Sequence, residues 1–261
     1  MPRFLFPVTA SLAAAAALTA GASAQDYYLS GSAGFNFQND SDNSGALTRD
    51  FITGDGVSIA PGTVWPSGSS VDWSTEFDSG VFLAGAFGYS YHSNWRGEIE
   101  VSYSEADVDT HTGVNVGGSS IGSADAAVLV TGATPLGMTV ADLVADGQGD
   151  ITTWALSVNG YYDFPIQNST FDVYVGAGIG LAEVKVEYSP SGIGIIDDSE
   201  MGTLFQAMFG ASYEINDNMD LFGGYRYRTT GDVETNSILF PTSLDIENDS
   251  HILEFGIRLT Q

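Results

Sequence analysis

The sequence contains no cysteine and few cations. Its 261 residues include 7 Lys and Arg against 33 Asp and Glu, which gives a formal net charge of −26. Without cysteine, neither a disulfide framework nor thiol chemistry is available. Because so acidic a surface repels nucleic-acid phosphates, we exclude nucleic acid as a partner and expect divalent cations at acidic loops. The alternative interpretation is that these loops are simply solvated.

Long hydrophobic runs are absent beyond the first two dozen residues. Arg3, a short apolar stretch and the small residues Ala22-Ser23-Ala24 form the pattern of a secretory signal peptide. We therefore expect residues 1–24 to be a signal peptide and residues 25–261 to form the exported domain. No later segment is apolar enough over the roughly 20 residues that a transmembrane helix needs.

Many segments of the sequence alternate polar and apolar residues. In residues 95–103, the charged residues Arg96, Glu98 and Glu100 alternate with apolar ones, a period of two that predicts a strand. Eight segments share this pattern, and each is long enough to cross a membrane at a tilt, which takes roughly 9–11 residues. They are residues 27–37, 77–91, 95–103, 151–164, 170–184, 203–215, 219–228 and 250–260.

The connections between these segments alternate in length. The short ones, rich in the Pro, Asn and Asp that favour turns, are residues 92–94, 165–169 and 216–218. The long ones are residues 38–76, 104–150, 185–202 and 229–249. Short periplasmic turns and long extracellular loops are typical of an outer-membrane barrel with an even number of strands.

The scarce cations indicate which strand face is polar and enclosed. Four of the five arginines in the predicted mature chain lie on strands, in phase with acidic residues. On an outer surface they would form ion pairs worth only about 0–1 kcal/mol each. In a narrow lumen, one guanidinium can bind several carboxylates. We therefore expect Ile99 and Val101 to face lipid and a structural ion network to fill the lumen. Its members are Arg96, Glu98, Glu100, Glu214, Asp220, Arg226, Arg228, Glu254 and Arg258.

Three sequence motifs suggest binding or catalysis only weakly. Gly176, Gly178 and Gly180 lie within a strand with no helix after them, so we read them as room for lumen side chains and not as a phosphate loop. The acidic stretches 40–45 and 146–150 suggest calcium loops, but the first has no glutamate at its closing position. His92 precedes Ser93 in a predicted short turn on the periplasmic side, and no pattern in the sequence assembles a serine and a carboxylate with His111 or His251 into a catalytic set. We therefore assign no catalytic residue, cofactor or metal site.

One long connection contains a possible short helix. In residues 139–145 (TVADLVA), Thr139 stands where an N-cap would and Asp142 is three residues later. The pattern leaves open whether this helix folds over the mouth of the barrel or stands in solvent.

Four strand motifs resemble a known family. NGYYDF (159–164), YVGAGIG (174–180), GYRYR (224–228) and HILEFGIRL (251–259) resemble the opacity-protein-like, OmpA-type barrels of Gram-negative bacteria. The resemblance implies a monomeric single-domain barrel in the cell outer membrane, surrounded by lipid and lipopolysaccharide, with periplasmic N- and C-termini. It also implies a role in adhesion, envelope integrity or host contact.

The sequence thus predicts an all-β fold: an eight-stranded antiparallel transmembrane up-and-down β-barrel with four long extracellular loops and short periplasmic turns. Its predicted function is structural or surface-interacting rather than enzymatic, with the loops contacting an extracellular ligand or surface. Three alternatives stay open: a narrow channel for small solutes, a lipid-modifying enzyme, and a soluble secreted barrel that holds an apolar ligand.

Overall fold

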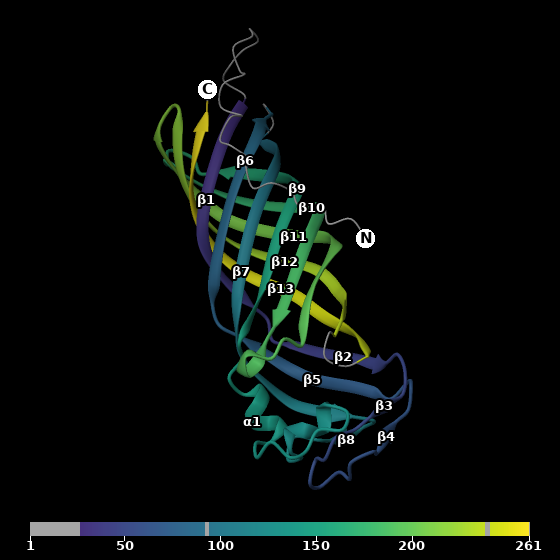
Figure 1. Ribbon diagram of the computed structural model, residues 1–261. Helices are drawn as coiled ribbons and strands as arrows, with labels where there is room; N and C mark the ends of the chain where they lie inside the picture. The colour runs from purple at the N-terminus through teal and green to yellow at the C-terminus, as the bar shows by residue number, and fades with distance from the viewer. Residues whose placement is uncertain (1–26, 92–93, 238–240, 261) are drawn as a thin grey trace.

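The computed structural model describes residues 27–91, 94–237 and 241–260 (Figure 1). The predicted signal peptide, residues 1–24, and His92 lie outside these ranges. The elements in chain order are β1 (Tyr27–Gln38), β2 (Ser41–Leu47), β3 (Phe51–Ile52), β4 (Val64–Trp65), β5 (Ser70–Phe77), β6 (Gly80–Ser90), β7 (Trp95–Val116), β8 (Ser119–Ser120), the 3-10 helix η3 (Ala126–Leu129), α1 (Val140–Val144), β9 (Gly149–Pro165), β10 (Phe171–Tyr188), the 3-10 helix η4 (Pro190–Gly192), β11 (Ile196–Asn216), β12 (Met219–Asn236) and β13 (Thr242–Thr260).

Eight strands form a closed antiparallel ring in the order β1, β6, β7, β9, β10, β11, β12, β13. The ring closes where β1 pairs with β13, with Tyr28 opposite Thr260. Each of the eight predicted segments falls largely in one of these strands, so the predicted eight-stranded antiparallel barrel is confirmed. The start of β1 and the end of β13 lie at the same end of the barrel, with the short turns 166–170 and 217–218 (Figure 1).

The four long connections are where predicted. Residues 185–202 and the described part of 229–249 are mostly strand, whereas residues 38–76 and 104–150 combine strands with long irregular segments. β7 continues to Val116, β10 to Tyr188 and β12 to Asn236, while β13 already begins at Thr242. These extensions keep the two-residue alternation of the barrel strands, and they satisfy their backbone hydrogen bonds by pairing with one another. The sequence did not predict these strand extensions, whereas the irregular stretches 53–63 and 130–139 agree with the predicted loops.

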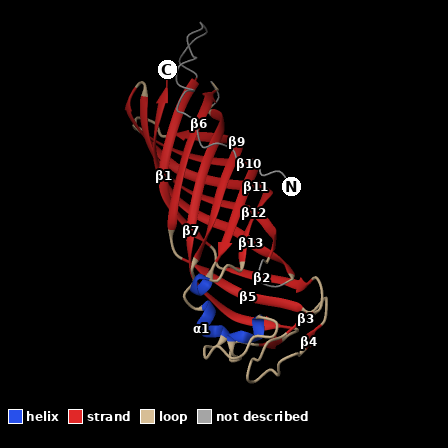
Figure 2. Cartoon of the chain, in the orientation of Figure 1, coloured by secondary structure: helices blue, strands red, loops and turns tan. Residues whose placement is uncertain are grey.

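The extensions build a second unit, which we call the cap region: residues 39–79, 105–150, 182–202 and 229–249. Beyond the ends of β1 and β6, β2 and β5 take their places between β13 and β7. β3 and β4 form a separate two-stranded sheet. The helical segments lie along one side of the cap region (Figure 2).

The helix expected near residue 139 is present as α1. Thr139 is its N-cap, and its hydroxyl accepts a hydrogen bond from the Asp142 amide while the Asp142 carboxylate accepts one from the Thr139 amide. This reciprocal capping box satisfies two amides that the first turn leaves without partners. α1 packs its Val140, Leu143 and Val144 side chains into the cap region.

The apolar core lies in the cap region, because the barrel interior is largely polar. Buried apolar side chains from β2, β5, β7, β10 and β13, among them Val71 and Ile246, form one cluster with those of η3 and α1. No helix within the described ranges is both long and apolar enough to span a membrane.

Candidate functional site

The barrel exposes apolar side chains on its outside and buries charged ones inside. Ile99 and Val101 on β7 are 56% and 49% exposed, whereas Glu98 and Glu100 between them are 8% and 2% exposed. The same alternation holds along β10, β11 and the second half of β13. Such an outer surface suits hydrocarbon, while the interior must satisfy its charges internally.

Arg226 on β12 is the centre of the largest group of ion pairs in the lumen. Its Nη1 lies 2.5 Å from Oε1 of Glu100 on β7, and its Nη2 lies 3.1 Å from Oε1 of Glu254 on β13. Gln206 on β11 accepts a third hydrogen bond, 2.9 Å from Nη1. One buried guanidinium thus connects three other strands and neutralises part of the charge of two carboxylates.

A second group occupies the lumen nearer the short turns. Arg96 binds Asp163 through two nitrogens, at 2.7 and 2.9 Å, and its guanidinium lies 4.6 Å from the centre of the Tyr161 ring. Glu98 accepts hydrogen bonds from Tyr28 at 2.9 Å and Tyr161 at 2.8 Å, so hydroxyl groups satisfy this buried carboxylate. This carboxylate needs no arginine directly beside it.

The remaining predicted network residues differ in their surroundings. Arg258 forms an ion pair with Asp220 at 3.2 Å. Arg228 is buried, 3.5 Å from the Ser104 hydroxyl, and one of its terminal nitrogens has no hydrogen-bond partner among the described residues. Glu214 is exposed at the short-turn end and forms no ion pair with any residue the structure describes.

Some partners in the lumen were not identified from the sequence. Asp163, Tyr28, Tyr161 and Gln206 all lie in the inward phase of their strands. The inward phase of β9 would have indicated Asp163 and Tyr161, because every second residue of a barrel strand points to the lumen. The cross-lumen reach of each side chain could not be read from one strand.

Gly176 and Gly178 of β10 have the steric role expected of them. A Cβ atom on Gly176 would overlap the Tyr161 ring, and one on Gly178 would overlap the Asn159 side chain. One on Gly180 would overlap the backbone at Leu156. The lumen is therefore filled by side chains: the space around Arg96, Glu98 and Arg226 leaves only about 30 Å³ open to the centres of water molecules.

The polarity of the two strand faces reverses where the barrel meets the cap region. On β10, Ile179 and Leu181 point outward and are 54% and 58% exposed. Two residues further on, the outward positions hold Glu183 and Lys185, and the apolar Val184 between them is fully buried. The alternation continues unbroken, but the apolar side changes from the outside of the barrel to the inside of the cap region.

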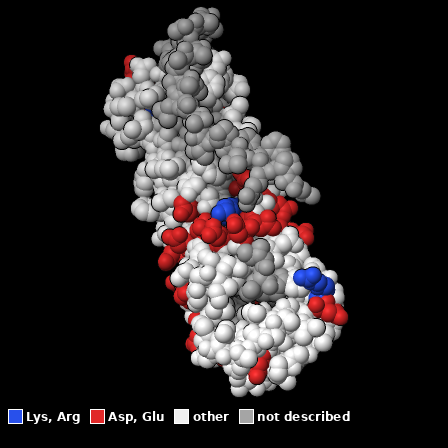
Figure 3. Space-filling model, in the orientation of Figure 1, with Lys and Arg blue, Asp and Glu red and all other residues white. Residues whose placement is uncertain are grey.

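β7 and β13 reverse at the same level. The outward series on β7 runs through Val101 and Tyr103 to Glu105, while the inward series changes from Ser104 to Ala106. Along β13 the outward Leu253 is followed toward the cap region by acidic residues. Figure 3 shows the result as a band of acidic side chains across the middle of the face in view. This acidic belt consists of Glu105, Asp107, Asp109, Asp150, Glu183, Glu187, Asp197, Asp232, Glu234, Asp245, Glu247 and Asp249.

Asp125 anchors the helical segment of the cap region. Its carboxylate accepts hydrogen bonds from the backbone amides of Ala127, Leu136 and Gly137 at 2.8–2.9 Å. These bonds favour the charged form and lower the pKa of the carboxyl below its usual value. The carboxylate thereby fixes both ends of the segment between η3 and α1.

His111 and His251 have structural surroundings. His111 is buried in the cap region, with Nδ1 2.8 Å from the Thr75 hydroxyl and its ring against that of Tyr188. Burial lowers the pKa of His111 to about 4. His251 lies at the acidic belt, with Nδ1 2.5 Å from the Tyr225 hydroxyl.

The sequence profile of a family described as surface antigen matches residues 39–248, which is most of the chain. The protein belongs to this surface antigen family. The outer membrane protein PagN of Salmonella typhimurium is 42% identical over 82 residues, or 29% of this chain and 34% of PagN. The putative adhesin RP828 of Rickettsia prowazekii is 29% identical over 112 residues, or 41% of this chain and 50% of RP828. The matches thus span one third to one half of the length of these curated relatives.

A solved structure shows the same fold as this surface antigen. The outer membrane protein OprG from Pseudomonas aeruginosa has a TM-score of 0.53 and 14% sequence identity, covering 91% of this chain and 97% of OprG. The protein is a bacterial outer-membrane β-barrel, as predicted. Its apolar outer surface is bounded by aromatic clusters: Trp95 and Tyr162 near the short turns, and Tyr103 and Trp154 next to the acidic belt. Such girdles are found where barrels meet the two membrane interfaces.

Proposed function

We propose that this surface antigen is an adhesin-type surface-interaction protein, with the barrel as an inert stem and the cap region as the binding part. The observation that carries the proposal is the cap region itself. It is an ordered unit with its own apolar core, built on strands that continue from the barrel. A barrel that served only to seal the membrane would not need it. The relative named as a putative adhesin supports the same function.

In this proposal the cap region is extracellular, and the short turns and both termini are periplasmic. Short periplasmic turns and long extracellular connections are the rule for bacterial barrels. Protease added to intact cells should therefore cleave within residues 39–79 or 117–139 and spare the turn 217–218. Cleavage restricted to the 217–218 side would show that the orientation is reversed.

The far end of the cap region is the surface that fits a partner best. It exposes apolar side chains that no lipid covers in the proposed orientation, whereas the belt below it is acidic. Ile52 and Val130 lie close together, since the Thr131 hydroxyl donates a 2.7 Å hydrogen bond to the Ile52 carbonyl. The exposed apolar residues of this tip are Ile52, Val57, Val64, Val130 and Leu136. Exposed apolar side chains grouped in this way are typical of interaction sites.

Adhesion can be tested with the full chain displayed on a non-adherent bacterial strain. We expect the cells to gain attachment to epithelial monolayers, and Ile52→Asp with Val130→Asp to reduce it at least about tenfold. Met201→Asp, a matched change at an exposed position away from the tip, should keep attachment. Equal attachment by the wild type and the empty strain, at verified surface display, would contradict the proposal.

We further propose that the lumen network is structural and closes the barrel to solutes. The cross-strand bonds of Arg226 and the small space left around them support this. The protein reconstituted in planar bilayers should give no conductance steps. Discrete, reproducible steps would favour the alternative of a narrow solute channel.

The acidic belt suggests how the protein contacts the surrounding lipid. It lies just beyond the aromatic cluster of Tyr103 and Trp154, at the level of lipopolysaccharide phosphates in the proposed orientation. Two anionic surfaces attract each other only through cations, so divalent ions would bridge them. Binding of the purified protein to lipopolysaccharide vesicles should require Mg²⁺ or Ca²⁺ and be lost on adding a chelator. Binding that is unaffected by chelation would rule out this bridge.

A further inference from the structure

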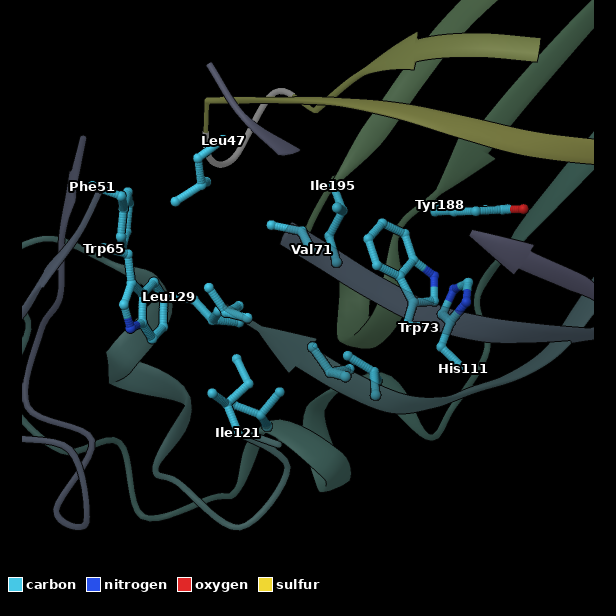
Figure 4. Close-up of a pocket in the computed structure, with 14 residues that line it drawn as sticks. Leu47, Phe51, Trp65, Val71, Trp73, His111, Ile121, Leu129, Tyr188 and Ile195 are labelled. Carbon is cyan, nitrogen blue, oxygen red and sulfur yellow. The ribbon is translucent and has the colours of Figure 1, made fainter. Parts of the chain in front are cut away.

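An apolar cavity lies inside the cap region, where side chains from several elements converge (Figure 4). Phe51 and Trp65 from the β3–β4 hairpin line one end, and Trp73 and Tyr188, from β5 and β10, line the other. Leu129 of η3 closes a further side. The cavity is separate from the barrel lumen, and none of its lining residues belongs to the ion network described above.

The size and surface of the cavity favour an apolar guest over water. About 40 Å³ is open to the centres of water molecules, more than the roughly 10–15 Å³ that one water requires. However, the described residues that line the cavity contribute no polar atom to its surface. A buried water needs two to four polar partners, and apolar cavities of this kind stay dry but bind small apolar molecules.

The aromatic side chains that line the cavity indicate which class of apolar molecule it fits. The rings of Phe51 and Trp65 are stacked, with centroids 5.8 Å apart and planes 20° apart. Facing them across the cavity, the Trp73 and Tyr188 rings offer additional faces and edges, which favour a flat aromatic guest. A charged guest would lose its hydration without gaining a partner.

We propose that this cavity is a binding site for a small uncharged ring compound. The open 40 Å³ is the space that the centre of a water-sized sphere can reach, so the walls stand further apart than this volume and leave room for a single small ring at most. In the proposed orientation, the ligand enters from the cell exterior past the β3–β4 hairpin, which forms a sheet of its own and whose Trp65 is only half-buried. This proposal is independent of adhesion, since it concerns the interior of the cap region and not its tip.

The test uses the purified full chain in lipid nanodiscs, titrated with fluorobenzene and followed by fluorine NMR. We expect a saturable bound signal that empty nanodiscs of the same lipid do not give. Fluorobenzoate, which has the same ring and a negative charge, should give none. A wild-type signal no different from that of empty nanodiscs would reflect partition into lipid and overturn the proposal.

Two variants and a control locate the site. Val71→Phe fills the cavity and should weaken fluorobenzene binding at least about tenfold, while Val173→Phe, the same change at an exposed position on the outside of the barrel, should leave it unchanged. Leu129→Ala enlarges the cavity and should admit fluoronaphthalene, which the wild type excludes. The proposal fails if folded Val71→Phe binds as tightly as the wild type. It also fails if Leu129→Ala does not admit the larger ring, a result that stands even if Val71→Phe does not fold.

Discussion

Arg226 reaches across the lumen to Glu100, and its Nη2 donates a 2.8 Å hydrogen bond to Oε2 of that carboxylate. The two residues lie on β12 and β7, which do not pair with each other in the ring. Both side chains are almost completely buried. The bond therefore connects opposite walls of the barrel in a way that backbone pairing cannot, and Glu254 binds the same guanidinium.

Removal of this guanidinium should destabilise the barrel strongly. Arg226→Met leaves the carboxylates of Glu100 and Glu254 buried without their main cation, which typically costs about 3–5 kcal/mol. Urea unfolding in detergent micelles, read by the gel-mobility shift of the folded barrel, measures the loss. Arg49→Met, at an exposed position, is the control and should change stability by no more than about 0.5 kcal/mol. Equal stability of the two variants would show that the ion pairs of Arg226 do not stabilise the barrel.

The inward glycines of β10 should tolerate no side chain. Gly178→Val places methyl groups against Asn159 and Gln206, so the strands must separate or the network must rearrange. We expect the variant to lose at least about 3 kcal/mol of stability or to fail to assemble into a heat-resistant barrel. Ala177→Val, the adjacent outward position, should assemble normally, because its side chain meets lipid. A heat-resistant Gly178→Val barrel of wild-type stability would contradict the steric explanation.

The barrel was predictable from the sequence, but the cap region was not. In the barrel, every second residue along a strand faces outward and is mostly apolar, and short turns join pairs of successive strands. These two features together predict how many strands there are and in which order they pair. In the cap region the same alternation continues, but the outward positions become polar, as from Leu181 to Glu183 on β10. The sequence of these extensions therefore suggested polar loops. Only the pairing of β2 and β5 with β13 and β7, distant in sequence, makes these segments strands.

The lumen residues show a similar limit. The alternation along a strand predicts that a side chain points into the lumen. Which residue it binds there depends on its position along the barrel axis and on the side chains of the opposite strands. Arg96 therefore binds Asp163, which strand phase places inside the barrel but which was not predicted as a member of the network. Glu214 has the inward phase, yet it lies at the rim of β11, where solvent reaches it. The apolar cavity depends on side chains from many separate segments and has no local sequence signal at all.

The position on β10 where the outward residues change from apolar to charged should coincide with the edge of the membrane. A charge introduced on either side of it should therefore have a different effect on stability. Val175→Arg places a charge in the apolar band and should cost about 2–4 kcal/mol, the range found near the bilayer midplane. Glu183→Arg, on the same outward face beyond the boundary, should cost about 0–1 kcal/mol. Refolding into lipid vesicles and denaturant titration of both variants measure the difference. Equal costs would place the boundary elsewhere.

Acidification should loosen the cap region through His111. Because burial lowers the pKa of His111 to about 4, the folded cap region binds this proton less readily than the unfolded chain, where histidine titrates near 6.5. The neutral, buried His111 therefore makes its full contribution to the stability of the cap region above about pH 6.5. This contribution is lost as the pH falls from that value toward 4, at about 1.4 kcal/mol per pH unit. Asp146 opposes the shift by favouring the charged ring, but burial is the larger effect.

Amide hydrogen exchange of residues 70–77 and 105–116, measured between pH 7 and pH 4 and corrected for intrinsic rates, should show this loss of up to about 3 kcal/mol. His111→Phe keeps a buried ring but removes the titration, so its exchange should depend less on pH. Barrel amides of residues 95–103 in the same sample provide the reference, because protonation of His111 does not alter their pairing. If His111→Phe loses protection on acidification as much as the wild type, the dependence arises from another group, and His111 does not control the stability of the cap region.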